Sequence, residues 1–104
     1  MTYRPLPECI IITESPIHGM GLFANEDIPI EFDLGIAHIR IFGFPQDYCR
    51  TPLGGFYNHS DNPNCKLIEK YDPTTLFYVQ NLITITNILK GDEITCKYTL
   101  YSLE

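Results

Sequence analysis

Turn-forming residues interrupt this chain from end to end and restrict it to short elements of secondary structure. Eight prolines and seven glycines occur in 104 residues, and turn signals recur at intervals of roughly 8 to 15 residues. Apolar residues do not sustain the i, i+3, i+4, i+7 spacing of an amphipathic helix over about ten positions anywhere in the chain. No sequence repeat, low-complexity tract or linker divides it. The sequence therefore predicts one mainly β domain, residues 1–104, with little helix.

The expected strands are short runs of β-branched or alternating apolar residues. The alternation in the clearest of them places Ile83 and Ile85 on the core face, and the last one places Ile94, Cys96 and Tyr98 on one side. The expected strands cover residues 9–13, 22–24, 32–42, 66–71, 76–80, 82–86 and 93–98.

Two connections are less regular. Asp72-Pro73-Thr74 lies between two expected strands and predicts a hairpin with a type I turn, with proline at its second position. Residues 46–55, which include Asp47 and Tyr48, show no clean periodicity. A short helix or a loop is expected there.

The charge of the chain bears on its partners. The net charge is -6 and the sequence pI is near 4.9, without a cluster of lysine and arginine. Such a surface repels a phosphate backbone, so nucleic acid is not expected as a direct partner. Acidity favours a basic ligand such as a lysine- or arginine-rich peptide, and it equally serves solubility alone.

Cysteine spacing and hydropathy indicate a soluble, intracellular protein. The four cysteines contain no C-x-x-C pair, so free buried thiols are expected in place of a zinc site or a disulfide framework. The longest aliphatic run, residues 10–12, is far shorter than the roughly 20 residues that cross a bilayer, and residues 1–8 have no signal-peptide pattern. Neither a membrane nor a metal is expected as a partner.

Three segments could carry chemistry, and each also has an ordinary structural interpretation. Gly19-Met20-Gly21 allows a ligand to approach bare backbone, or is simply a hairpin turn. Asn58-His59-Ser60, with Pro63-Asn64-Cys65 after it, presents amide donors and acceptors, or forms an Asx-turn loop. Gly91-Asp92-Glu93 leads to Tyr98, which can lie at the edge of the core with its hydroxyl in water.

A covalent mechanism is a formal alternative at the second segment. Cys65 would be the nucleophile and His59 its base. Neither an orienting third group nor an oxyanion donor can be named for this pair, so the sequence disfavours it.

Taken together and in order, the three segments resemble the SET-domain family of protein-lysine methyltransferases. Residues 19–24, GMGLFA, resemble the family's G-x-G-[LV]-F-A. Residues 58–65, NHSDNPNC, resemble N-H-S-x-x-P-N-C, and residues 91–98, GDEITCKY, resemble G-E-E-[LI]-T-x-x-Y. The resemblance extends over residues 10–98, which is most of the chain.

The resemblance implies a fold, a cofactor and a reaction. The fold would be β-clip-like, with several small sheets around a C-terminal pseudoknot. The cofactor would be S-adenosyl-L-methionine, and its methyl group would pass to the ε-amine of a lysine in a protein substrate, with a basic protein or peptide expected.

The resemblance also assigns residues. Gly19, Met20 and Gly21 would line the cofactor site through their main chain, with the Asn58 side chain and the His59 backbone. Tyr98 would be catalytic, and Tyr48 is the next choice for a second tyrosine of the lysine channel. Weaker choices for that second tyrosine are Tyr57, Tyr78 and Tyr101.

The chain departs from the family pattern in two places. Gly55 stands where many members have an arginine that can contact the cofactor. Cysteine-rich segments before and after the domain are absent, and only six residues follow Tyr98 in this sequence. Either the active site is more open than in larger relatives, or a second copy completes it, and a homodimer is the expectation. So small a domain suggests a viral, phage or bacterial source, and the host cytoplasm or nucleus if viral.

Two other functions stay open. One is a binding module or pseudoenzyme that keeps the SET fold and binds cofactor or peptide without methyl transfer. The other is a structural or virion protein on the same β scaffold, which would not bind the cofactor at all.

Overall fold

The computed structural model describes residues 6–40, 48–74 and 76–97. Within these residues the chain is mainly β, as predicted, and its helix has five residues. In chain order the elements are β1 (Ile10–Glu14), β2 (Met20–Ala24), β3 (Asp33–Arg40), β4 (Tyr48–Arg50), α1 (Pro52–Phe56), β5 (Asn58–His59), β6 (Cys65–Asp72), β7 (Phe77–Thr84) and β8 (Glu93–Cys96).

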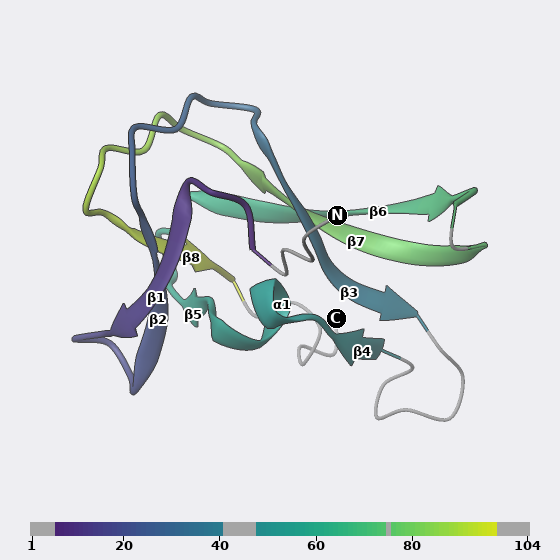
Figure 1. Ribbon diagram of the computed structural model, residues 1–104, viewed down its shortest axis with the longest axis horizontal. Helices are drawn as coiled ribbons and strands as arrows, with labels where there is room; N and C mark the ends of the chain where they lie inside the picture. The colour runs from purple at the N-terminus through teal and green to yellow at the C-terminus, as the bar shows by residue number, and fades with distance from the viewer. Residues whose placement is uncertain (1–5, 41–47, 75, 98–104) are drawn as a thin grey trace.

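Strand β8 holds the sheet together. The strand order is β1-β2-β8-β6-β7-β3-β4, and β5 pairs with β8 beside this path. β8 is antiparallel to β2 and parallel to both β5 and β6. In Figure 1 the long strands β3, β6 and β7 lie on one side of the molecule, and β1, β2 and β8 lie on the other. The last described strand is therefore enclosed by earlier parts of the chain.

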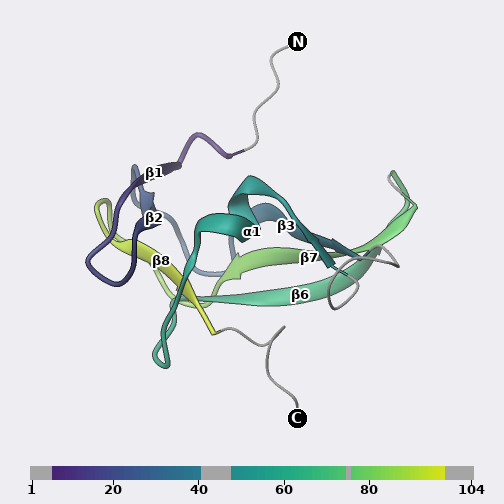
Figure 2. The same cartoon turned by 90° about the horizontal axis from the view of Figure 1, so that it is seen from below.

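Helix α1 packs against β3 and also contacts β2 and β4, and Figure 2 shows it on one side of the long strands. The Thr51 side chain caps the helix by accepting from the Gly54 N–H at 3.3 Å. A Cβ at Gly54 would collide with the Ala37 carbonyl of β3, so this position lets helix and strand approach closely. The apolar core includes Leu22, Leu34, Leu53, Leu82, Ile88 and Ile94.

Two connections of the chain have matching structures. Residues 21–34 and 81–94 follow the same course of strand, turn, bridge and strand. They meet at Ile28 and Ile88, whose backbones exchange two hydrogen bonds of 2.8 Å. Figure 1 shows the two loops together above β1 and β2. The sequence shows no such repeat, because apart from these isoleucines the two stretches are identical only at Leu22 and Leu82.

The predicted core face of residues 82–86 is wrong. Leu82 and Thr84 are fully buried, whereas Ile83 is half-buried and Ile85 is 38% exposed. The Thr84 hydroxyl donates to the Pro29 carbonyl at 2.6 Å and accepts from the Phe32 N–H at 2.8 Å. Because both of its roles are satisfied, threonine takes the inner position. The two strands predicted over residues 76–80 and 82–86 are in fact one strand, β7, which runs through Asn81 and ends at Thr84.

The segment 46–55 contains both a strand and a helix. β4 pairs with β3, with Ile39 opposite Cys49, and α1 follows it. A strand of three residues is too short for its periodicity to be recognised in the sequence. The 72–77 connection is also wider than a simple turn, since the Leu76 N–H donates to the Asp72 carbonyl and Leu76 has φ of 66°. Residue 75 lies outside the described residues.

The four cysteines are free. Cys9, Cys65 and Cys96 are buried, as predicted, but the prediction is wrong for Cys49, which is half-buried. Among the described residues, no helix is long and apolar enough to cross a membrane.

Candidate functional site

The turn between β1 and β2 forms one wall of the candidate site. The Ser15 N–H donates to the Gly19 carbonyl at 2.7 Å, and the Ser15 hydroxyl accepts from the Ile17 N–H at 3.0 Å. Gly19 has φ of +50°, and a Cβ there would meet no atom within 4 Å. The turn is therefore fixed by its own hydrogen bonds, while the backbone at Gly19 faces open space.

Asn58 lies buried between this turn and β8. Its Nδ2 donates to Glu93 Oε2 at 2.7 Å, the shortest of its contacts. The other acceptors within reach are the Ser15 hydroxyl at 3.1 Å, the His18 carbonyl at 3.2 Å and the Met20 carbonyl at 3.3 Å. Two amide hydrogens serve four acceptors. Acceptor oxygens therefore outnumber donors at this point.

The Glu93 carboxylate is the charged member of the cluster, which we call the Asn58 cluster: Ser15, His18, Met20, Asn58 and Glu93. The Ser15 hydroxyl lies 2.8 and 2.7 Å from its two oxygens. Gly21 leaves the space in which the carboxylate lies, because a Cβ there would collide with it and approach Asn58 Nδ2 to 3.0 Å. This contact explains why the second glycine of the 19–21 segment lacks a side chain.

Asn64 ties the other end of the same loop to β8. Its Nδ2 donates to the Glu93 carbonyl at 2.8 Å, and its Oδ1 accepts from the Thr95 N–H at 2.9 Å. The Asn64 amide thus bonds to the backbone of β8 at Glu93 and Thr95, and the Glu93 side chain contacts Asn58. Two asparagines of one motif therefore hold the backbone and the side chain of a single residue of β8.

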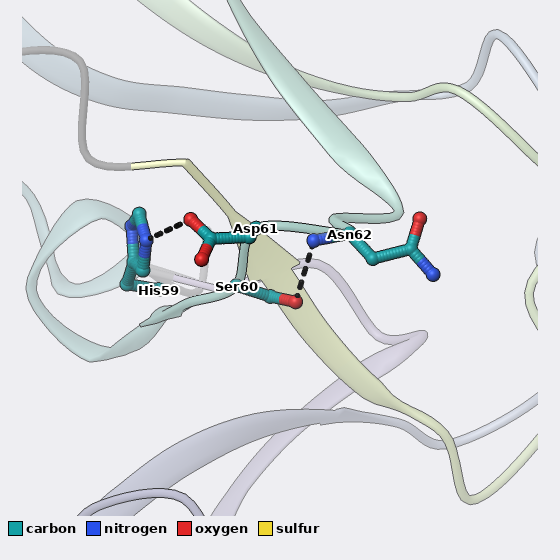
Figure 3. Close-up of polar contacts among 4 residues, drawn as sticks. All are labelled: His59, Ser60, Asp61 and Asn62. Carbon is teal, nitrogen blue, oxygen red and sulfur yellow. Dashed lines mark hydrogen bonds and ion pairs between the residues drawn. The ribbon is translucent and has the colours of Figure 1, made fainter.

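His59 and Ser60 form the loop between these asparagines. The His59 backbone lies in β5 opposite Cys96, and the Ser60 N–H donates to the Cys96 carbonyl at 3.3 Å. The side chains turn to neighbours within the loop, as Figure 3 shows. His59 Nε2 lies 3.0 Å from Asp61 Oδ1, and the Ser60 hydroxyl accepts from the Asn62 N–H at 3.0 Å. The loop presents its main chain to β8.

The predicted site residues fall into two groups. Gly19, Met20, Gly21, Asn58 and His59 lie together, on the β1–β2 turn and on β5 beside β8.

The tyrosines are less defined. Tyr98 and Tyr101 lie outside the described residues, and Tyr48 lies in β4, where only the backbone is described. Tyr57 is buried and meets the His38 ring edge-on at 6.1 Å. Tyr78 is half-exposed and packs on Tyr71 near the 72–77 connection, away from Asn58.

Burial governs the titration of the groups inside the core. It raises the pKa of the Cys65 thiol to about 12, and the nearby Cys96 contributes to that rise. Such a thiol is not a ready nucleophile, which agrees with the rejection of a Cys65–His59 mechanism. Burial also lowers the pKa of His38 to about 4, with a smaller effect of Arg50.

Sequence reasoning missed Ser15 and the pairing role of Glu93. Ser15 precedes Pro16 in a stretch that looks like an ordinary turn, and 78 residues separate it from Glu93. The only sequence signal was the position of Glu93 inside the third motif.

The Asn58 cluster has the chemistry of a site for a cationic, polar ligand. It combines one carboxylate and two main-chain carbonyls with an amide, next to the open backbone of Gly19. Acceptor oxygens of this kind stabilise a positive charge. The ammonium and sulfonium groups of S-adenosylmethionine carry such charges, so the residues present fit that cofactor.

Comparison with known proteins agrees with the resemblance of the sequence motifs. Residues 39–99 match the family described as the SET domain. A structure of a Plasmodium falciparum protein, described as a "putative histone methyltransferase", superposes with a TM-score of 0.73 at 26% identity, over 92% of this chain and 96% of that one. No curated protein sequence matches the chain.

A second similar structure is larger. It is a humanized mutant of the Chaetomium thermophilum Polycomb Repressive Complex 2 bound to an inhibitor, with a TM-score of 0.68 at 19% identity. The match covers 86% of this chain and 15% of that one. At this identity the likeness is one of fold.

Proposed function

The chain belongs to the SET-domain family, and on that premise we propose that it transfers a methyl group from S-adenosylmethionine to the ε-amine of a lysine in a protein substrate. The predicted SET fold is confirmed by the family match and by the similar structures. The observation that carries the proposal is the meeting of three distant segments in the Asn58 cluster.

We assign cofactor binding to the residues around that cluster. Gly19, Met20 and Gly21 would contribute main-chain groups, Asn58 its side chain and His59 its backbone. The support is the excess of acceptor oxygens at Asn58 and the open space beside Gly19. S-adenosylmethionine, when bound, supplies an electrophilic methyl group on a sulfonium cation. The chain's own part is to bind and orient that group and to exclude water from it.

The lysine must reach the methyl group as a neutral amine. A free lysine has a pKa near 10.4, so losing its proton at a pH of about 7.4 costs about 4 kcal/mol. Burial and a neighbouring cation both lower an amine pKa, whereas a carboxylate in the channel would raise it. We therefore assign the channel to Tyr98 and, second, to Tyr48. A tyrosine hydroxyl can orient the amine without adding charge.

A basic protein or peptide is the proposed substrate. The net charge of -6 attracts such a partner over distance, and the field of exposed carboxylates is screened by salt. Methyl transfer should accordingly be faster at low ionic strength than at high.

The deciding experiment measures binding and turnover separately. Calorimetry with S-adenosylmethionine tests the cofactor site, and a mass assay on mixed basic peptides tests methyl transfer. Tyr98→Phe should abolish methyl transfer and leave cofactor binding intact. Tyr78→Phe removes a hydroxyl from a ring far from Asn58 and is the matched control. Unimpaired turnover in Tyr98→Phe would show that the catalytic assignment is wrong.

The same experiment separates the alternatives. Cofactor binding with no gain of mass on any peptide would indicate a binding module, and no cofactor binding would indicate a structural protein. A homodimer that completes the channel stays a prediction. Sedimentation at several protein concentrations tests it, and activity that rises with dimer formation would support it.

A further inference from the structure

A cavity of about 330 Å³ lies away from the Asn58 cluster. Its walls come from residues 7–9, which precede β1, and residues 26–29 and 32, which follow β2. Because Ile10 pairs with Ala24 and Glu14 with Met20, this cavity is at the open end of the β1–β2 hairpin. The Ser15–Gly19 turn closes the other end, about 17 Å away at 3.4 Å per residue.

The cavity has a fixed apolar base. Cys9 and Ile28 line it and are buried, and Ile28 is held by its two backbone bonds to Ile88. The Asn25 N–H also donates to the Cys9 carbonyl at 2.6 Å, which joins the two walls. Phe32 lines the cavity with 40% of its surface exposed. A ligand would thus find a preformed hydrophobic surface with an accessible ring.

Three carboxylate residues line the same cavity: Glu8, Glu26 and Asp27. Asp27 is oriented by the Lys90 N–H, which donates to its Oδ1 at 2.8 Å. Glu26 lies close enough to Cys9 for its charge to add to the rise in the thiol pKa that burial causes. The described residues contain no group of side chains placed to hold a metal ion. Separated carboxylates over an apolar base suit a long cation with a hydrocarbon stem.

We propose that this cavity binds a lysine or arginine side chain of a peptide, with its stem on Ile28 and Phe32 and its charged end at Glu26 and Asp27. Its volume is at the small end of ligand pockets and suits one long side chain. Negative charge excludes a nucleotide. The cavity can bind such a side chain whether or not the protein is an enzyme. Its role as a second contact for a methylation substrate, away from the lysine that accepts the methyl group, rests on the proposed function.

The test uses a fluorescent, lysine-free peptide of alternating arginine and glycine, without cofactor. Binding is followed by anisotropy and by amide NMR shifts. Shifts should concentrate at residues 8–9 and 26–32, and the double variant Glu26→Gln/Asp27→Asn should bind about five- to tenfold more weakly. Phe32→Ala should also weaken binding.

The control Glu14→Gln/Glu69→Gln removes the same charge elsewhere and should stay within about twofold of the wild type. An equal loss of peptide affinity in both double variants, or NMR shifts elsewhere, would overturn the proposal. Either result would leave only nonspecific electrostatic attraction between the acidic protein and the basic peptide. If a cavity variant fails to fold, the wild-type shifts alone decide. Methyl transfer without binding here would overturn this proposal only. Binding here without methyl transfer would overturn the proposed function only.

Discussion

The stretches 21–34 and 81–94 have the same backbone course but hold different polar groups. Their hydrogen bonds are reciprocal: the Gly91 N–H donates to the Ala24 carbonyl at 2.8 Å, and the Glu31 N–H donates to the Thr84 carbonyl at 2.9 Å. The two residues whose N–H groups donate these bonds, Glu31 and Gly91, both have positive φ. The backbone of one connection therefore repeats that of the other.

The side chains at the strand ends differ. Asn81 of β7 donates to both oxygens of Asp33 at 3.0 Å, so that carboxylate is paired with the neighbouring strand. At the matching place Gly21 has no side chain, and Glu93 instead contacts Asn58 and Ser15. The candidate site thus forms where Gly21 offers Glu93 no side-chain partner, and Asn58 and Ser15 take that place.

The same contrast recurs two residues further on. The Gly35 N–H is satisfied locally, by Asp33 Oδ1 at 2.9 Å. The matching Thr95 N–H is satisfied by Asn64, 31 residues away. The Gly35 N–H is thus satisfied within its own strand, whereas the Thr95 N–H depends on the 58–65 loop.

The largest expected effect comes from giving position 21 the residue found at its matching position, 81. Gly21→Asn introduces the residue of position 81 into space that Glu93 and Asn58 occupy. We expect a loss of about 3 kcal/mol of stability from overpacking, and no measurable binding of S-adenosylmethionine. Urea denaturation and calorimetry measure the two. Gly55→Ala is the control, since a Cβ there meets nothing within 4 Å. Normal cofactor binding by Gly21→Asn would refute the role of this space.

A second pair of variants places an added carboxylate beside Glu93 in one case and beside Asp33 in the other. Asn58→Asp against Glu93, and Asn81→Asp against Asp33, should each lose about 2 kcal/mol at neutral pH. Only Asn58→Asp should weaken cofactor binding. Repulsion raises the folded pKa of the pair above its unfolded value, so stability should recover below about pH 4 and fall as pH rises. Denaturation at pH 4 and 7 measures this, and equal effects on cofactor binding would contradict the comparison.

The remote support of β8 can be removed alone. Asn64→Ala leaves the Thr95 N–H and the Glu93 carbonyl without their partner and should cost about 1 to 2 kcal/mol. Because β8 leads toward Tyr98, we expect methyl transfer to fall more than cofactor affinity. Asn62→Ala, at an exposed position of the same loop, should change neither. A parallel loss of both activities in Asn64→Ala would argue against a separate effect on β8.

The smallest effects concern the matched turns. Gly91→Ala places a side chain at φ of 96° and should destabilise the chain by about 1 kcal/mol. Glu31→Gly relieves the same kind of strain at φ of 63° and should stabilise it by up to about 1 kcal/mol. Denaturation midpoints compare the two. Changes of the same sign would show that the turns are not equivalent.

Sequence periodicity predicted most strands and failed where burial does not follow hydropathy. Ile94 and Cys96 are buried as expected, but the alternation at 82–86 was assigned to the wrong face. Thr84 is inside because Pro29 and Phe32 from another connection satisfy its hydroxyl. A pattern of apolar residues contains no information about such a partner.

The sequence by itself determined local features: the short strands, their turns and three motifs. The glycines and asparagines of these motifs can take backbone conformations and hydrogen bonds that follow from their own chemistry. Only the tertiary structure decided which of these groups meet. The bond from Asn58 to Glu93 joins residues 35 apart, and the bond from Ser15 to Glu93 joins residues 78 apart. Such contacts depend on β8 lying between β2 and β6, and that placement is set by packing of the whole sheet rather than by any segment.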